Sequence, residues 1–153
     1  MATWYPETKE DVSVLTFIKE LFEDTDFVTV VDEYPDSTLT IPTVSVEQGE
    51  TILTEYEMGN RSGRRIRQYI INVFAANKSQ RDDYSYRIVN ALENGIVVYN
   101  YNEGFPSEGV TPTVLEHLDV VSRRIIPIEV LPELVEKLYF RSAVKFVATN
   151  DRD

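Results

Sequence analysis

The sequence predicts an α+β domain with a mainly antiparallel sheet, a long projecting β-hairpin and two helices packed on one face of the sheet. Two segments, 8–23 and 79–94, place apolar residues three and four positions apart, as amphipathic helices do. Short runs rich in β-branched residues lie between and after these segments, and a glycine-containing turn at 59–63 joins two of them. Runs of strands interrupted by single helices are typical of α+β folds with antiparallel sheets.

We expect one domain to cover residues 1–153. A chain of this length buries roughly two-thirds of its surface on folding, which is enough for one hydrophobic core. Hydrophobic residues make up 42% of the chain and charged residues 27%, so the composition indicates a folded protein. No internal repeat or low-complexity tract marks a second domain.

The first predicted helix begins near Thr8, because Thr8 and Asp11 have the spacing of a capping box. Apolar side chains then recur at helical intervals from Val14 to Leu21 and form one buried face. The remaining positions are charged and are expected to face solvent: Lys9, Glu10, Lys19, Glu20 and Glu23.

Three extended stretches follow this helix, at 27–31, 38–48 and 50–58. Pro42 lies in the second stretch and places it at a sheet edge or a bulge, because proline has no N–H to donate to a neighbouring strand. The third stretch leads into the turn at 59–63 and a further strand that ends near residue 76. We predict a long hairpin whose base lies in the core and whose tip projects from it.

The second predicted helix begins with another capping-box spacing, at Ser79 and Asp82, and has a buried stripe formed by Tyr84, Ile88, Ala91 and Leu92. Gly95 follows, where a positive φ is expected at the helix end. The rest of the chain predicts a strand at 96–101, a loop at 102–113 and a closing antiparallel pair at 117–130 and 138–148. In the last strand four residues are expected to face the core: Leu138, Phe140, Val144 and Phe146.

Composition excludes several kinds of chemistry and of location. The chain has no cysteine, hence no disulfide and no thiolate metal site. No apolar run approaches the roughly 20 residues that span a bilayer, so we expect no membrane partner. The acidic start MATWYPETKED does not resemble a secretory signal, so we expect synthesis in a cytoplasm. The formal net charge of −11 disfavours tight binding to nucleic acid.

No catalytic constellation is apparent, and we expect neither a cofactor nor a metal. His117 is the only histidine, and no nucleophile or second ligand is spaced around it. Asp36 and Glu47 faintly resemble the carboxylates of a metal-dependent nuclease, but position 49, where a lysine would assist the water, is glycine. A β-turn with an exposed strand glutamate is the simpler interpretation.

The nine tyrosines leave two interpretations open. Tyr99 and Tyr101 alternate on a strand, and Tyr84 and Tyr86 lie in the second helix. Such rings can stack on the bases of single-stranded nucleic acid. They can equally lie at core margins and protein contacts with the hydroxyl still hydrated, and the acidic net charge favours this second interpretation.

Arginines gather around the predicted hairpin turn of this otherwise acidic chain: Arg61, Arg64, Arg65 and Arg67. They form either a solvated hairpin tip or an arm that binds a carboxylate-rich surface on a neighbouring copy, since arginine makes bidentate contacts with carboxylates. The acidic stretch 23–26, with Asp32 and Glu33, offers such a surface. Separate blocks of opposite charge suit head-to-tail contacts, which can close into rings.

The element order resembles that of the tail terminator proteins of long-tailed bacteriophages, also called tail-completion, tail-to-head joining or neck proteins. An N-terminal amphipathic helix, a long hairpin, a central helix on the sheet and a last pair of strands carry the resemblance. The stretches most similar to such proteins are IPTVSVEQGE at 41–50, the run from GNRSGRRIRQ to NEGFP at 59–106, and ELVEKLYFRSAVKFVAT at 133–149.

This resemblance implies a non-enzymatic virion protein that forms a ring of six copies on the last ring of the tail tube. The ring stops tube growth, contacts the tail-tube protein on one side and the head-completion or connector protein on the other, and lets DNA pass without binding it. The four arginines would then contact a neighbouring subunit or the tube. A small monomeric or dimeric adaptor domain that binds another protein is the alternative.

Overall fold

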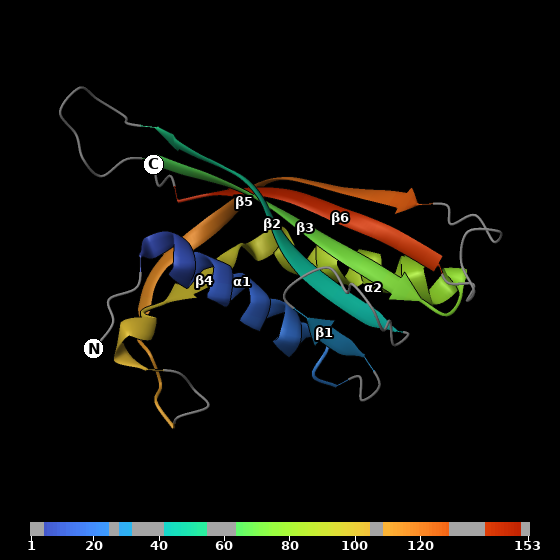
Figure 1. The fold of residues 1–153 in the computed structure, drawn as a ribbon, viewed down its shortest axis with the longest axis horizontal. Helices are drawn as coiled ribbons and strands as arrows, with labels where there is room; N and C mark the ends of the chain where they lie inside the picture. The colour runs from blue at the N-terminus through green and yellow to red at the C-terminus, as the bar shows by residue number, and fades with distance from the viewer. Residues whose placement is uncertain are drawn as a thin grey trace.

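The computed structural model describes residues 5–24, 28–31, 42–54, 64–104, 109–128 and 140–150 (Figure 1). Within these ranges the chain is an α+β protein with two α-helices and one six-stranded sheet, as the sequence predicts. The helices and strands have these bounds: α1 Pro6–Leu21, β1 Thr29–Val31, β2 Thr43–Thr54, β3 Arg64–Ala75, α2 Lys78–Ala91, β4 Ile96–Tyr99, β5 Val114–Ile128 and β6 Phe140–Thr149, with 3-10 turns at Leu92–Asn94 and Tyr101–Glu103.

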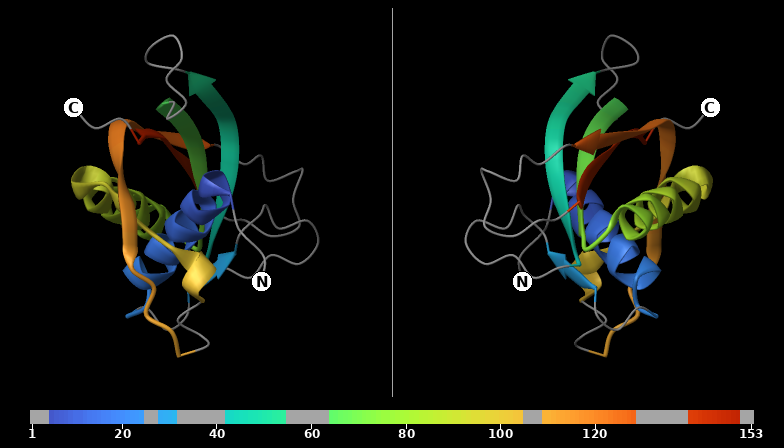
Figure 2. Two further views of the ribbon diagram at one scale, coloured as in Figure 1. Left: turned by 90° about the vertical axis from the view of Figure 1, so that its left-hand side faces the viewer. Right: turned by 90° about the vertical axis from the view of Figure 1, so that its right-hand side faces the viewer.

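The sheet has the strand order β1-β2-β3-β6-β5-β4 and is strongly curled (Figure 2). Only the short pairing of β1 with β2 is parallel, and every other neighbouring pair is antiparallel. β5 bends near an irregularity between Val120 and Ser122, so its first part pairs with β4 and its second part with β6 (Figure 1). The curl therefore arises at the bend of β5, where this strand passes from one neighbour, β4, to the other, β6.

Both helices pack on the same face of the sheet, which confirms their predicted placement. Ser85 of α2 hydrogen-bonds to Ser142 of β6, and the α1 residue Asp11 accepts a hydrogen bond from Tyr69 of β3. Tyr69 lies directly across from Phe146, and Ser142 lies across from Val73, so these side chains share one face. The core lies between this face and the helices and is formed by Val14, Ile18, Val44, Val46, Tyr69, Ile71, Val73, Tyr84, Ile88, Leu92, Val98, Leu118, Val144 and Phe146, among others.

Helix α1 begins two residues earlier than the sequence predicts, and the capping box is wrong. Tyr5 is the N-cap residue and Pro6 the first helical residue, a position where the missing proline N–H costs nothing. Asp11 is instead engaged by β3 side chains. The prediction that Lys9 and Glu10 face solvent is also wrong, because the sheet covers this end of α1 and buries both.

Helix α2 is capped by Asn77, whose side chain accepts a hydrogen bond from the Gln80 N–H at 2.8 Å, rather than by Ser79. The predicted stripe is otherwise confirmed, with Tyr84 and Ile88 buried against the sheet. Gly95 ends the following 3-10 turn with a φ of 77°, as predicted. A Cβ at this position would lie 2.6 Å from the Leu118 carbonyl oxygen, so only glycine fits there.

The predicted strands at 38–48 and 50–58 are one strand in the structure. β2 runs unbroken through residue 49 with an irregularity between Gln48 and Thr51, and it pairs with β3 as far as Thr54 and Arg64. Residues 55–63, the predicted hairpin tip, lie outside the described residues. In β6, Val144 and Phe146 are buried as predicted, whereas Phe140 at the strand start is exposed; Leu138 is not among the described residues.

Neither helix in the described part of the chain has the length and the apolar character needed to cross a membrane.

Candidate functional site

Three of the four predicted contact arginines lie at the start of β3, and the structure shows the partners of two of them. Arg65 and Arg67 point toward the face that carries α1, because residues two apart in a strand share a face. Arg64 opens β3, but its side chain is not among the described ones, and Arg61 lies outside the described residues.

Arg67 is buried, with its side chain only 4% exposed, and every nitrogen of its guanidinium has a partner. Nη1 donates to Glu10 Oε1 at 2.8 Å and to the Glu7 carbonyl oxygen at 3.2 Å. Nη2 donates to Asp11 Oδ1 at 2.6 Å, and Nε donates to Thr51 Oγ1 at 3.0 Å. Arg67 therefore ties strands β2 and β3 to the first turns of α1.

Arg65 joins a third strand to the same cluster. Its Nη2 contacts Glu10 Oε2 at 3.0 Å and Glu116 Oε1 of β5 at 2.7 Å. Its backbone N–H donates to Asn150 Oδ1 at 2.6 Å, just beyond β6. Glu10, whose side chain is 0% exposed, thus has one oxygen on each arginine, and we call Glu10, Asp11, Arg65, Arg67, Tyr69 and Glu116 the buried charge cluster.

Burial and pairing act against each other in this cluster. Burial raises the pKa of Glu10 above its ordinary value, although the hydrogen bond from Arg65 pulls it down. Burial lowers the pKa of Arg65, but the hydrogen bonds and the negative charges of Glu10 and Glu116 together outweigh burial, so the pKa is raised. Burial also raises the pKa of the Tyr69 phenol, which donates to Asp11 Oδ1 at 2.8 Å. The arginines stay charged, and the cluster holds α1 on the sheet.

The sequence did not identify the carboxylates of this cluster. The sequence pattern places Glu10 on a solvated helix face and Asp11 in a helix cap, and it gives no sign of a role for Glu116. The one available signal was the i, i+2 spacing of Arg65 and Arg67, which places two cations on one face of a strand and requires anionic partners on the element that covers it. Arg65 and Arg67 are engaged within the chain itself, and the inter-subunit or tube contact of the four arginines stays a prediction.

The sheet has two long open edges within the described residues. β1 pairs only with Thr43–Ser45, so from residue 46 to 54 β2 has a strand on one side alone. β4 pairs only with residues 114–118 of β5, which leaves residues 119–128 with β6 as their single neighbouring strand. An open edge presents unpaired backbone N–H and C=O groups and accepts a further strand.

The two open edges are exposed and differ in charge. On β2, Leu53 is 65% exposed and Ile52 41%; on β5, Val121 is 59% exposed. The open part of β2 carries Glu47 and Glu50 and no basic residue, whereas that of β5 carries Arg123 and Arg124 and the single acidic residue Asp119.

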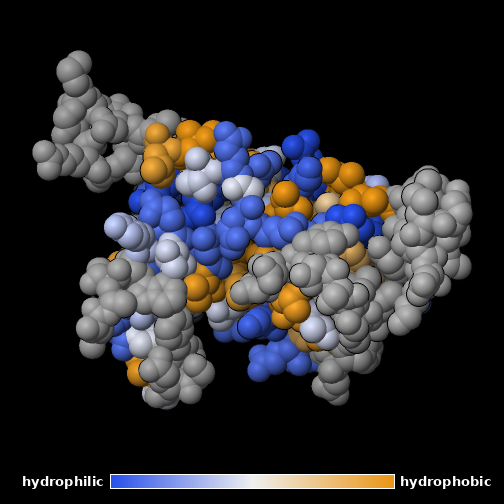
Figure 3. All heavy atoms as spheres, in the orientation of Figure 1, coloured by the Kyte–Doolittle hydropathy of each residue, from blue (hydrophilic) through white to orange (hydrophobic). Residues whose placement is uncertain are grey.

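The open part of β2 and that of β5 reach opposite ends of the molecule (Figure 1). In the same orientation, Figure 3 shows apolar atoms at the surface over the far end of β2. The two edges are different surfaces of opposite charge, so one can face the other only between two copies placed head to tail.

The sequence candidates for catalysis do not form a site. His117 is exposed on β5, and Asp36 lies outside the described residues. Glu47 Oε2 accepts a hydrogen bond from Asn72 Nδ2 at 2.7 Å, which gives this carboxylate a structural role. The described residues contain no group of three or more histidine, aspartate or glutamate side chains placed to hold a metal ion.

The tyrosines considered for base stacking are divided among different places. Tyr84 is a core residue, whereas Tyr86 lies exposed on the other side of α2. Tyr99 and Tyr101 lie together, with ring centroids 6.2 Å apart, and line a cavity described below.

Comparison of the chain with protein-family models and with curated proteins gives no match.

Proposed function

We propose that this chain is a non-enzymatic structural subunit of a ring at the head-proximal end of a long-tailed phage tail, which ends growth of the tail tube and joins tail to head. The observation that supports the proposal most is the pair of open, oppositely charged strand edges on one sheet. The α+β fold with both helices on one face agrees with the resemblance described above.

Strand edges give a physical route to a ring. The acidic edge of β2 in one copy faces the basic edge of β5 in the next, and backbone hydrogen bonds extend the sheet across the contact. Because the two surfaces differ, the contact is heterologous, and a heterologous contact repeated with a closing rotation forms a ring. Opposite charges at the two edges guide the partners into register and disfavour pairing of like edges.

The charge of the whole chain suits a channel for DNA. Six copies of a chain with a net charge of −11 would carry −66, so DNA passing through such a ring would not be held. Arg61 and Arg64, which precede or open β3, are proposed to contact the tail-tube protein or the neighbouring subunit. The protein would be made in the host cytoplasm and end in the virion, between tube and connector.

The oligomeric state of the purified protein tests the proposal. Native mass spectrometry is expected to show a closed species near six copies. Charge reversal at one edge, Arg124→Glu or Glu50→Arg, should shift the population to monomers, and the two substitutions combined in one chain should restore the ring because each contact again joins opposite charges. Asp83→Lys is the matched control, since Asp83 lies exposed on α2 and on neither edge.

Two outcomes would contradict this assembly. A wild-type protein that stays monomeric or dimeric at high concentration favours the alternative, a small protein-binding adaptor domain. Rings that persist in both single charge-reversal variants would show that subunits meet through other surfaces. A protein absent from purified virions would exclude the tail role itself.

A further inference from the structure

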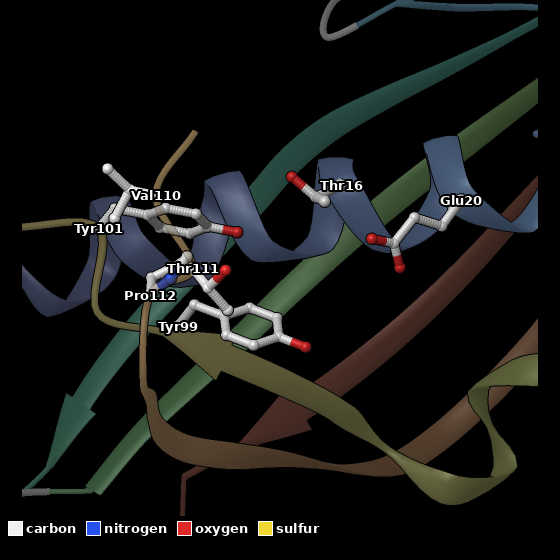
Figure 4. A pocket seen from close by; sticks show the side chains of 7 residues that line it. All are labelled: Thr16, Glu20, Tyr99, Tyr101, Val110, Thr111 and Pro112. Atoms are coloured by element: carbon white, nitrogen blue, oxygen red, sulfur yellow. The ribbon is translucent and has the colours of Figure 1, made fainter. Parts of the chain in front are cut away.

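A cavity of about 180 Å³ lies between helix α1, the end of β4 and the segment that leads into β5 (Figure 4). It is separate from the buried charge cluster and from both open edges. Its walls come from three parts of the chain: Thr16 and Glu20 of α1, Tyr99 at the end of β4 with Tyr101 just after it, and Val110, Thr111 and Pro112 before β5.

The two tyrosines are held in place by hydrogen bonds of the backbone around them. The Tyr99 N–H donates to Ser13 Oγ of α1 at 3.2 Å, and the Asn100 N–H donates to the Thr113 carbonyl oxygen at 2.9 Å. Tyr101 is buried and Tyr99 half-buried, with an angle of 60° between their rings. The rings therefore form a fixed aromatic wall.

The segment before β5, which lies beside the two tyrosines, is fixed as well (Figure 4). Glu103 accepts a hydrogen bond from Thr113 Oγ1 at 2.7 Å, which joins the turn after β4 to the segment before β5. Gly104 has a φ of 130°, and a Cβ there would lie 2.9 Å from Val110 Cγ2, so glycine allows Val110 to approach. A cavity whose walls are already ordered binds a ligand at a lower entropic cost.

Among the described residues that line the cavity, Glu20 alone is charged. Figure 4 shows its carboxylate directed toward the tyrosines and the two tyrosine hydroxyls directed toward Glu20. Glu20 is exposed near the end of α1, and no described residue forms an ion pair with it. A carboxylate with two aromatic rings is a lining that attracts cations and repels anions.

We propose that this cavity binds the side chain of an arginine presented by a protein partner. The planar guanidinium stacks on a tyrosine ring, and its N–H groups donate to the Glu20 carboxylate and the tyrosine hydroxyls. A volume of about 180 Å³ equals that of about six water molecules at ~30 Å³ each. An arginine side chain has six non-hydrogen atoms beyond Cβ, so the cavity has room for them.

Arginine is favoured over other cationic groups by its shape. Lysine offers a compact ammonium that neither stacks on a ring nor donates in a fork to a carboxylate. The net charge of −11 attracts either cation toward the subunit, so the discrimination must arise inside the cavity. The proposal does not depend on ring formation, because an adaptor domain would use the same cavity.

The test is a titration of the full chain with N-acetyl-arginine amide, followed by NMR signals of the tyrosine side chains. Binding should saturate, with the largest shifts at Tyr99 and Tyr101. N-acetyl-lysine amide should bind more weakly, and N-acetyl-citrulline amide, which has the same shape without the charge, more weakly still. Glu20→Gln and Tyr99→Leu should each weaken arginine binding about fivefold.

The control substitution is Glu23→Gln, which removes an exposed carboxylate from the residues after α1 without touching the cavity, and it should leave the affinity unchanged. Glu20 is exposed, so Glu20→Gln is expected to fold normally, and circular dichroism checks this. Equal binding of the arginine and citrulline compounds, or an unchanged affinity in Glu20→Gln, would overturn the proposal.

The source of the arginine is distinguished by a second ligand. The peptide GNRSGR has the sequence of residues 59–64 and carries Arg61 and Arg64. If it binds more tightly than N-acetyl-arginine amide, and loses this advantage in Glu20→Gln, the arginine comes from a second copy of the chain. If the amide binds in the cavity and the peptide does not, the arginine belongs to a different protein.

Discussion

Replacing Arg67 by methionine is expected to destabilise the subunit more than any other single change in the buried charge cluster. Methionine retains the length and the apolar contacts of the side chain but removes its charge and all of its donors. Among the described residues, the change leaves the fully buried Glu10 with Arg65 as its remaining cation and leaves Asp11 with the Tyr69 hydroxyl as its remaining partner.

The magnitude follows from these contacts. Arg67 donates to two carboxylates, a backbone carbonyl and a threonine hydroxyl. Removing one partner of a buried ion pair costs about 3–5 kcal/mol, chiefly because the other charge stays buried without compensation. For a domain of this size a loss of about 4 kcal/mol lowers the thermal midpoint by about 8–16 °C. Such a loss is a large part of the 5–15 kcal/mol that stabilises a typical domain.

Urea unfolding followed by far-ultraviolet circular dichroism measures the effect. The double variant Glu10→Gln/Arg67→Met should be less destabilised than the sum of the two single changes, with a coupling free energy of about 1–3 kcal/mol, because Arg67 compensates the Glu10 charge. Lys19→Met, at an exposed position of α1 without an ion pair to a described residue, should change stability by less than about 0.5 kcal/mol. Strict additivity, or a loss below about 1 kcal/mol in Arg67→Met, would refute the reasoning.

Three further changes test other parts of the fold. Burial raises the pKa of Tyr69 above its ordinary value of 10, so this residue stabilises the native state below pH 10, and that contribution is lost as the pH rises further. Above pH 10 the unfolding free energy of the wild type should therefore fall more steeply with pH than that of Tyr69→Phe, by up to about 1.4 kcal/mol per pH unit. Parallel curves for the two proteins would contradict the assignment. Asn77→Ala should cost about 1 kcal/mol in chemical denaturation, because the Gln80 N–H loses its acceptor, whereas Ser79→Ala should have little effect. Gly95→Ala should lower the thermal midpoint markedly, since the added Cβ meets the Leu118 carbonyl oxygen at a positive φ; Gly109→Ala, also at a positive φ but with open space around it, should be milder.

The sequence predicted the fold class well because hydrophobic periodicity is a local property. The stripe of α2 and the buried residues of β6 could be recognised from spacing alone, and so could the positive φ of Gly95. The cap of α2 was misplaced by two residues because Asn77 and Ser79 are both good N-cap residues, and only the completed helix shows which one is used.

The contacts of the charged residues could not be predicted in the same way. Glu10 and Arg67 are far apart in the sequence, and an isolated helix with a glutamate among lysines gives no sign that a strand will cover it. Burial of a charge depends on a partner brought by the tertiary fold, so local patterns assign it to solvent. The open edges of β2 and β5 could not be predicted from the sequence either, because they depend on which strands are adjacent and over what length they pair.

The position of β6 between β3 and β5 has a consequence for biogenesis. Until residues 140–149 have been synthesised, both neighbouring strands lack a partner, and the inward side chains of Val144 and Phe146 are missing from the core. Nascent chains without β6 therefore expose unpaired edges of β3 and β5, which makes them prone to aggregation. Formation of β6 is therefore the step that joins the β1-β2-β3 part of the sheet to the β5-β4 part.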